Sequence, residues 1–232
     1  NLFPHIAGCA DDIALARSMT ADFSEHAQGN FYMHTGFPFL GLPSAGAWVN
    51  YGLGSVNQNL PGYVVLNNKT GIPHGGKSIF GSGFLPATTG ASFFNLDQEE
   101  VVSRVKPRRP LKEQRASLEL LKQLDGAFAK RSAAEGDVQS AVENYETAFR
   151  MQLAVPELMN LEKEPAYLKQ AYGLEHEDPL VARYGHQCMV ARRLVERGTR
   201  FIQIYSGGMA NQRSWDGHND IKGNHTGFAQ ET

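Results

Sequence analysis

A carboxylate and an imidazole near the end of the chain have the residue types of a metal site. Asp216 and His218 are separated only by Gly217, so both side chains can turn toward one ion on a flexible loop. A carboxylate oxygen and an imidazole nitrogen are common ligands for zinc, manganese or iron. Asp220 and His225 follow as further ligands or as partners of the ligands. The alternative is that Asp216 and Gly217 form an ordinary turn and that His218 is a surface residue.

Hydroxyl, carboxylate and imidazole groups also gather in residues 18–26. Asp22, Ser24 and His26 precede an expected helix, and the amino-terminal end of a helix favours anions. Ser24 or Thr20 with His26 has the residue types of a nucleophile and its base. The alternative is a Ser or Asp helix cap beside a histidine that has no catalytic role.

A glycine-rich stretch at residues 71–83 contains Lys77 but matches neither the P-loop nor the dinucleotide fingerprint. We therefore expect a surface loop that lies over a site. Lys77 and Arg17 are the candidates for contact with a substrate anion. The aromatic residues are expected to be core side chains rather than a sugar platform; they are Trp48, Phe31, Tyr32, Phe37 and Phe39.

The order of expected elements predicts an α/β fold with a mostly parallel sheet flanked by helices. Short apolar runs predict strands at residues 13–16, 63–66 and 199–205. Helical periodicity predicts helices at residues 111–128, at 138–153 after an N-cap at Asp137, at 181–195, and a short one opening at Pro165. Residues 97–175 would form a helical insertion or cap. Because chemistry collects at the carboxyl ends of parallel strands, residues 17–36 and 206–225 are expected to form the site.

Composition limits the class of protein. The 232 residues contain 22 Lys plus Arg against 24 Asp plus Glu, a net charge of -2, which gives no electrostatic case for nucleic acid or an anionic membrane as partner. Two cysteines cannot build a disulfide-rich scaffold. No apolar run approaches the roughly 20 residues of a membrane helix. The chain begins at Asn1 without a signal peptide and stops at Thr232 without a closing element, so we expect an internal fragment of a longer protein.

Several long runs give the chain a family resemblance. They are 16–19 with His26, 33–36, 46–54, 57–65, 81–86, 143–151, 154–159, 191–198 and Trp215-Asp216-Gly217-His218. In this order they resemble the sulfatase-like "domain of unknown function 1501" family of exported bacterial proteins, over essentially the whole chain.

The resemblance implies a partial alkaline-phosphatase or sulfatase-like α/β domain over residues 1–232. That superfamily hydrolyses phosphate or sulfate esters with one or two divalent metals, so Asp216 and His218 would be metal ligands. The metal would be zinc, calcium, manganese or magnesium, and the substrate a small-molecule or glycan ester. A twin-arginine signal upstream of Asn1 would place the protein in the periplasm or outside the cell.

The sequence departs from the superfamily pattern in the loop that holds Asp22. Asp22 stands in the register of the nucleophile, and Glu25 replaces an Asn. Asp22 would then be a ligand, or Ser24 the nucleophile, or the loop would hold no nucleophile. Cys9 and Cys188 do not fit the formylglycine motif of true sulfatases. Further family motifs would lie beyond both ends, so the fragment alone would be inactive.

The leading hypothesis is an exported metal-dependent hydrolase of phosphate or sulfate esters, with Asp216 and His218 on the metal and Asp22, Ser24 and His26 in the same cleft. The alternative is a non-catalytic exported binding or surface-assembly protein on the same scaffold. A metal-site isomerase or phosphotransferase is a third, weaker reading.

Overall fold

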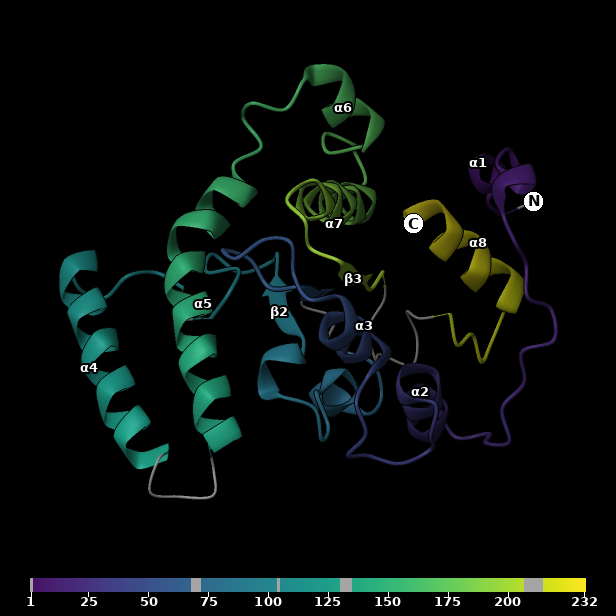
Figure 1. Cartoon of the computed structure of the whole chain (residues 1–232). Helices are drawn as coiled ribbons and strands as arrows, with labels where there is room; N and C mark the ends of the chain where they lie inside the picture. Colours follow the sequence, from purple (N-terminus) through teal and green to yellow (C-terminus); the bar gives the residue numbers. More distant parts are fainter. Residues whose placement is uncertain (1, 68–71, 104, 130–134, 207–214) are drawn as a thin grey trace.

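A three-stranded parallel sheet forms the centre of the molecule. The computed structural model describes residues 2–67, 72–103, 105–129, 135–206 and 215–232. The strands are β1 (Tyr63–Asn67), β2 (Ser92–Asn95) and β3 (Phe201–Ile204), in the order β2-β1-β3 (Figure 1). Val64 of β1 aligns with Ser92 on one side and with Ile202 on the other. All three strands therefore end at the same edge of the sheet.

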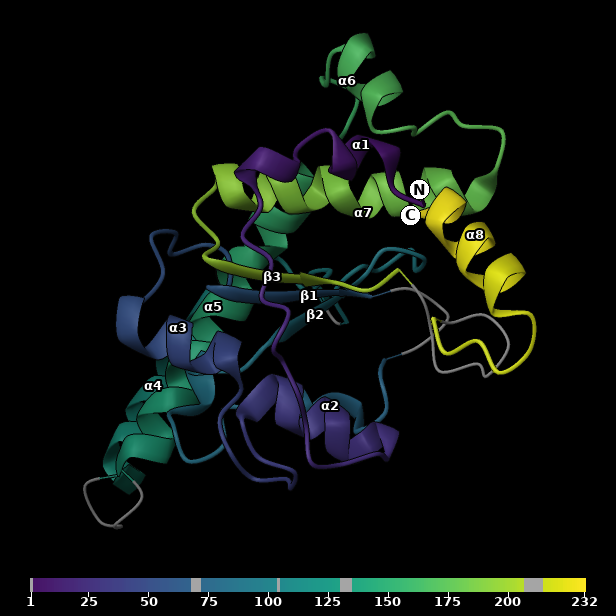
Figure 2. The same ribbon diagram turned by 90° about the vertical axis from the view of Figure 1, so that its right-hand side faces the viewer.

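The central strand is buried on both faces. Residues 63–66 of β1, the run Tyr-Val-Val-Leu, have no exposed surface. An unbroken apolar run of this kind is typical of a parallel strand covered by helices on both sides. Figure 2 shows α7 (Pro179–Glu196) on one face of the sheet, with α2 (His26–Thr35) and α3 (Ala45–Leu53) on the other.

Alternate side chains of β1 enter two separate cores. Val64 and Leu66 pack with Phe94 of β2 and with residues of α7 and α5 (Glu135–Met159). Tyr63 and Val65 pack on the opposite face with Ile79 and Phe80 of the 3₁₀ segment η2 (Gly76–Phe80). The remaining elements lie around these cores; they are α1 (Pro4–Ala7), η1 (Ala10–Asp12), η3 (Ala87–Thr89), α4 (Leu111–Ala129), α6 (Ala166–Ala171) and α8 (Ile221–Glu231).

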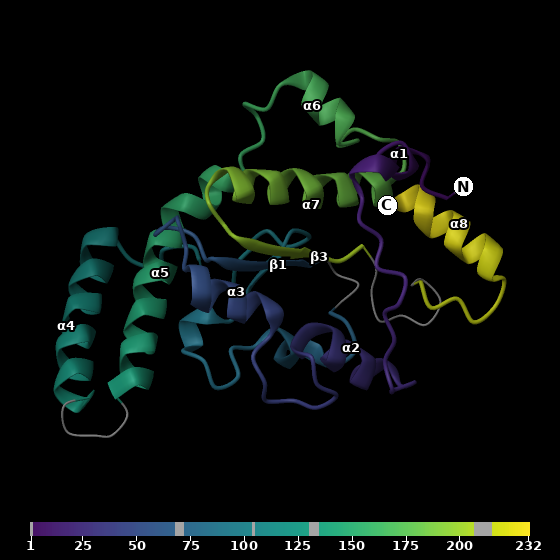
Figure 3. The ribbon, with the colours of Figure 1, turned by 45° about the vertical axis from the view of Figure 1, so that its right-hand side comes forward.

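Helices α4 and α5 form an antiparallel hairpin that projects from the body, on the side away from α2 and α8 (Figure 3). Arg115 of α4 joins the two helices through an ion pair of 2.7 Å with Glu146 of α5. The last turns of α5 leave the hairpin and contribute Met151, Val155 and Leu158 to the core. The segment 97–175 thus contains both a projecting arm and part of the packing that supports the sheet.

The α/β class and the parallel sheet are confirmed, and the expected strands at 63–66 and 199–205 correspond to β1 and β3. The predicted strand at residues 13–16 is wrong. These residues form no strand, and Ile13 and Leu15 are 47% and 76% exposed. A short apolar run becomes a strand only where a neighbouring strand satisfies its backbone, and no described strand pairs with this segment. The strand β2 was not predicted, because its four residues lie within a loop-like, glycine-rich sequence.

The four predicted helices are present, with shifted boundaries. Asp137 is not an N-cap, because α5 already begins at Glu135. Pro165 is the N-cap of α6 rather than a residue of its first turn. The expectation that the aromatic set is buried holds in part for Phe31, which is half-buried against the core cluster of Ile79. It is wrong for the others, which are 39–55% exposed: Tyr32, Trp48, Phe37 and Phe39.

Candidate metal centre

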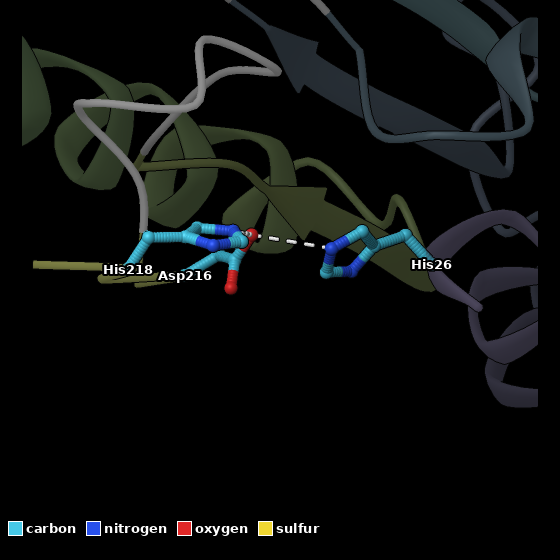
Figure 4. Close-up of side chains that lie close together, drawn as sticks. All are labelled: His26, Asp216 and His218. Carbon is cyan, nitrogen blue, oxygen red and sulfur yellow. Dashed lines mark hydrogen bonds and ion pairs between the residues drawn. The ribbon is translucent and has the colours of Figure 1, made fainter. Parts of the chain in front are cut away.

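Three side chains from two distant segments converge at the carboxyl edge of the sheet. The ligand atoms of His26, Asp216 and His218 all lie within 4.8 Å of one another. Asp216 Oδ2 is 2.8 Å from His218 Nε2 and 3.2 Å from His26 Nε2. Figure 4 shows the two imidazole rings on either side of the Asp216 carboxylate, with His26 approaching from α2. The structure thus brings together the two ligands expected from residues 216–218 and the histidine expected from residues 18–26.

Helix α2 fixes the position of His26, its first residue. The preceding residue, Glu25, is the N-cap, and its carboxylate accepts hydrogen bonds from the backbone N–H groups of Ala27 and Gln28 at 2.8 and 3.1 Å. A side-chain cap of this kind satisfies amide groups that the helix leaves unpaired. Glu25 therefore takes the capping role that the sequence assigned to a Ser or Asp.

A buried chain of hydrogen bonds ties α2 to the sheet. His34 Nδ1 lies 2.7 Å from the carbonyl oxygen of Asn30, which can only accept, so this nitrogen carries the proton. His34 Nε2 therefore accepts from the Tyr205 hydroxyl, also at 2.7 Å. Gln203 continues the chain, since its amide donates to Tyr205 at 3.4 Å and accepts from the hydroxyl of Tyr63. The chain crosses from β1 through β3 to α2 and holds the helix that carries His26.

The segment of Asp216 and His218 is held by the helix that follows it. Asp220 is the N-cap of α8 and accepts from the Gly223 N–H at 3.1 Å. His225 of α8 lies 2.9 Å from the carbonyl oxygen of Trp215 and packs against its indole ring. The structure thus shows Asp220 in a capping role and His225 in contact with the residue before Asp216.

A third imidazole, that of His74, lies beside the three candidate ligands. The ring of His74 stacks on that of His26, with centroids 5.2 Å apart. The hydrogen bond from His218, with the nearby charges of His218, His26 and His74, lowers the pKa of the Asp216 carboxyl below its ordinary value. The sequence reasoning missed His74, because it treated the glycine-rich loop as a cover. Its position after β1, at the carboxyl edge, is the signal that could have identified it.

The geometry suits a divalent metal. Zinc binds nitrogen and oxygen ligands at about 2.0–2.1 Å, so the ligand atoms of a tetrahedral site lie about 3.3–3.4 Å apart. The two spacings around Asp216, 2.8 and 3.2 Å, are close to that value, and all three candidate ligand atoms lie within 4.8 Å of one another. The side chains are 53%, 42% and 64% exposed for His26, Asp216 and His218. A metal held by three such side chains would keep positions open to solvent and to substrate.

The other predicted residues lie outside this cluster. Asp22 and Ser24 are exposed in the segment before α2. Among the described residues, no hydrogen bond joins Ser24 to His26, so the predicted nucleophile and base are not paired here. Their catalytic role stays a prediction. The amine of Lys77 lies over the ring of Phe93 at 5.1 Å, and Arg17 is exposed in a turn.

A comparison with known protein families identifies the family of this chain. The model of the family described as "Protein of unknown function (DUF1501)" matches residues 1–232. The chain belongs to this family. No curated protein and no solved structure matches it. In the part of the chain that the structure describes, no helix has the length and apolar character needed to cross a membrane.

Proposed function

We propose that this DUF1501 protein is a metal-dependent hydrolase of phosphate or sulfate esters. The observation that carries the proposal is the convergence of His26, Asp216 and His218 at the carboxyl edge of a parallel sheet. Two imidazoles and one carboxylate favour zinc, manganese or iron over calcium and magnesium, which prefer all-oxygen ligands. Open α/β sheets bind their ligands at this edge, which adds support from the topology.

The residues of the cluster have separable roles in this proposal. A bound divalent metal would polarise the ester oxygen and offset the charge that develops on the leaving oxygen. Asp216 supplies the anionic ligand, and its lowered pKa keeps it ionised. His26 and His218 supply neutral nitrogen ligands. His74 lies beside the ligands and is half-buried, so we assign it the proton transfer to the leaving oxygen.

The wider assignment rests on the sequence resemblance alone. An alkaline-phosphatase-like scaffold, a small-molecule or glycan ester as substrate, and export to the periplasm or beyond all belong to this proposal. The parallel sheet with helices on both faces is the structural feature that supports this scaffold.

The decisive experiment measures metal content and turnover together. Elemental mass spectrometry should find about one divalent metal per chain, which Asp216→Asn should abolish while keeping the size of the side chain. Asp125→Asn on α4 is the matched control, since the hairpin projects away from the cluster. Full metal occupancy in Asp216→Asn would contradict the assignment. A panel of phosphate and sulfate esters should then show release that depends on the metal.

A non-catalytic exported binding or surface-assembly protein is the second candidate. It is favoured by the absence, among the described residues, of a hydrogen bond between Ser24 and His26, and by the exposure of the cluster. Such a protein would retain metal or ligand affinity but release neither phosphate nor sulfate from any ester. Turnover that stops when the metal is removed would exclude it.

A further inference from the structure

A second hollow lies at the opposite edge of the sheet from the metal ligands. Its volume is about 740 Å³, within the range of small-molecule sites. Leu60, Pro61 and Gly62 line it just before β1, and Ala91 lines it just before β2. Helix α5 closes the far side with Glu143, Asn144, Thr147 and Arg150, which recur on one helical face. None of the three metal ligands contributes to this cavity.

The lining is rich in amide and hydroxyl groups. These groups come from α3 and the segment after it, from the segment after η2, and from η3, β2 and α5. They are Asn50, Asn57, Gln58, Asn144, Ser55, Ser82, Thr88, Thr89, Ser92 and Thr147. Amides both donate and accept, and so do hydroxyls. Four of these side chains already donate to backbone carbonyl oxygens; they are Asn50, Ser55, Asn57 and Thr89. The other six match a ligand that offers several hydroxyl groups. The lining suits a lipid or another apolar ligand poorly, because the polar groups would lose their hydrogen bonds to water.

The charges of the cavity add a preference for an anion. Lys77 and Arg150 line it with a single acid, Glu143. Arg150 donates from Nε to the carbonyl oxygen of Glu146, and Lys77 lies over Phe93. Within the described residues, neither cation forms an ion pair, whereas Glu143 accepts a hydrogen bond from Gln139. The cavity therefore has one excess positive charge, from the flexible ammonium of Lys77 and the planar guanidinium of Arg150. Both groups bind carboxylates.

Exposed aromatic rings come from the same segments as the lining. Trp48 and Tyr51 flank Asn50 on α3, and Phe84 follows Ser82. The rings of Trp48 and Phe84 meet edge to face at 5.8 Å, while Trp48 and Tyr51 are 6.2 Å apart. All three are 47–69% exposed. None of these three rings is part of the cavity lining, so the polar and charged groups of the walls alone would recognise a ligand there.

We propose that this cavity binds a short acidic oligosaccharide of the uronic-acid class. Its carboxylate is held by Arg150 and Lys77, and its hydroxyls are held by the amides and hydroxyls of the walls. The site is independent of the metal centre and does not rest on the proposed hydrolase activity. It makes the protein a carbohydrate binder through the amino-terminal edge of its sheet.

Isothermal titration of the protein with trigalacturonate, and with neutral galactotriose as the comparison sugar, tests the proposal. Saturable binding of trigalacturonate is expected, at least tenfold tighter than binding of galactotriose. Arg150→Gln should weaken trigalacturonate binding about tenfold or more, because a hydrogen bond to a charged group is lost. Lys112→Gln on α4 removes an equal charge outside the cavity and should have no effect.

Two further variants keep the proposal open to refutation. Thr147→Trp should place an indole in the wall one helical turn from Arg150 and weaken trigalacturonate binding about tenfold or more, while its circular dichroism spectrum should match that of the parent. Asp216→Asn should leave sugar binding unchanged, so a failed hydrolase proposal and a failed sugar proposal give different results. The proposal is overturned if trigalacturonate does not bind, or if it binds equally to the parent, Arg150→Gln and Thr147→Trp.

Discussion

The two edges of the sheet are built in different ways. At the carboxyl edge, His26, Asp216 and His218 meet through side chains that are about half exposed or more. At the amino edge, the cavity walls belong to packed elements, and many weak polar groups share the lining. A metal ion draws most of its affinity from a few ligands, whereas a sugar draws it from many hydrogen bonds. Loss of one candidate ligand at the carboxyl edge should therefore weaken metal binding about 100-fold, whereas loss of one hydrogen-bonding group at the amino edge should weaken sugar binding about tenfold.

Loss of the core between the sheet and helices α5 and α7 should destabilise the whole fold and with it both sites, which is the largest expected effect. Phe94 of β2 has no exposed surface and packs with residues of α5 and α7. Phe94→Ala should therefore cost about 3–5 kcal/mol of unfolding free energy. Phe84→Ala makes the same chemical change at a side chain that is 69% exposed, and should cost about 0.5 kcal/mol or less. Denaturant titrations of both variants give the comparison. Equal losses of unfolding free energy in the two variants would show that the core around Phe94 does not stabilise the sheet.

Removal of one candidate metal ligand should affect the carboxyl edge and leave the amino edge unchanged. His26→Ala should weaken metal binding about 100-fold or more, since even the partners of metal ligands contribute about 10–100-fold. Competition with a chromogenic chelator measures this affinity, and His5→Ala, an exposed histidine of α1, is the control. Binding of trigalacturonate should be unchanged in both variants. A parallel fall in sugar affinity would mean that the edges are coupled through the fold.

The difference between the edges also explains what could be predicted from the sequence. The sequence predicts the buried run at residues 63–66 and the strand after Gly198 well, because a short apolar run next to glycine is typical of a buried strand. Asp216 and His218 could be identified because only one residue separates them in the sequence, so their side chains can reach the same ion. Their contact with His26 was expected from the rule that parallel strands end at one edge, although the strand assumed before His26 does not exist.

The other features, which are the position of His74, the cavity and the exposed aromatic residues, depend on tertiary contacts that no local sequence pattern reveals. His74 joins the cluster only because the loop after β1 returns beside α2. The cavity needs Asn50, Ser92 and Thr147, which come from three separated segments and carry no motif. Trp48 and its exposed neighbours were expected in the core, because composition gives hydrophobicity but not the face that a helix presents.

The hydrogen-bond chain under the sheet should make a smaller contribution, with a defined pH dependence. Tyr205→Phe leaves His34 Nε2 without its donor and should cost about 1 kcal/mol of unfolding free energy. Burial lowers the pKa of His34 below its ordinary value of 6.5, so the unfolded state takes up the proton first. The stability due to neutral His34 is present above pH 6.5 and is lost as the pH falls through that value toward the lowered pKa. Thermal melts across this range should show the loss.

A control variant separates this chain from other titrating groups. His34→Gln should flatten part of the pH dependence, although His186, whose pKa burial also lowers, will contribute in the same direction. His176→Gln, at an exposed histidine in the loop before α7, should leave the profile unchanged. If His34→Gln and His176→Gln have identical profiles, the buried hydrogen bond to Tyr205 does not set the pH response.

The smallest expected effect on metal affinity tests whether His74 belongs to the carboxyl edge. His74 lies beside His26 but outside the three ligands, and its charge helps to lower the pKa of Asp216. His74→Asn should raise the Asp216 pKa slightly and weaken metal binding only a few-fold, because no ligand is lost. If His74 transfers a proton, the same variant should reduce kcat for ester hydrolysis about 100-fold or more while metal occupancy stays near that of the parent. NMR titration of the Asp216 carboxyl and turnover measured at full metal occupancy distinguish the two roles. A loss of metal as large as that in His26→Ala would instead make His74 a fourth ligand, and the carboxyl edge would then hold three histidines around one carboxylate.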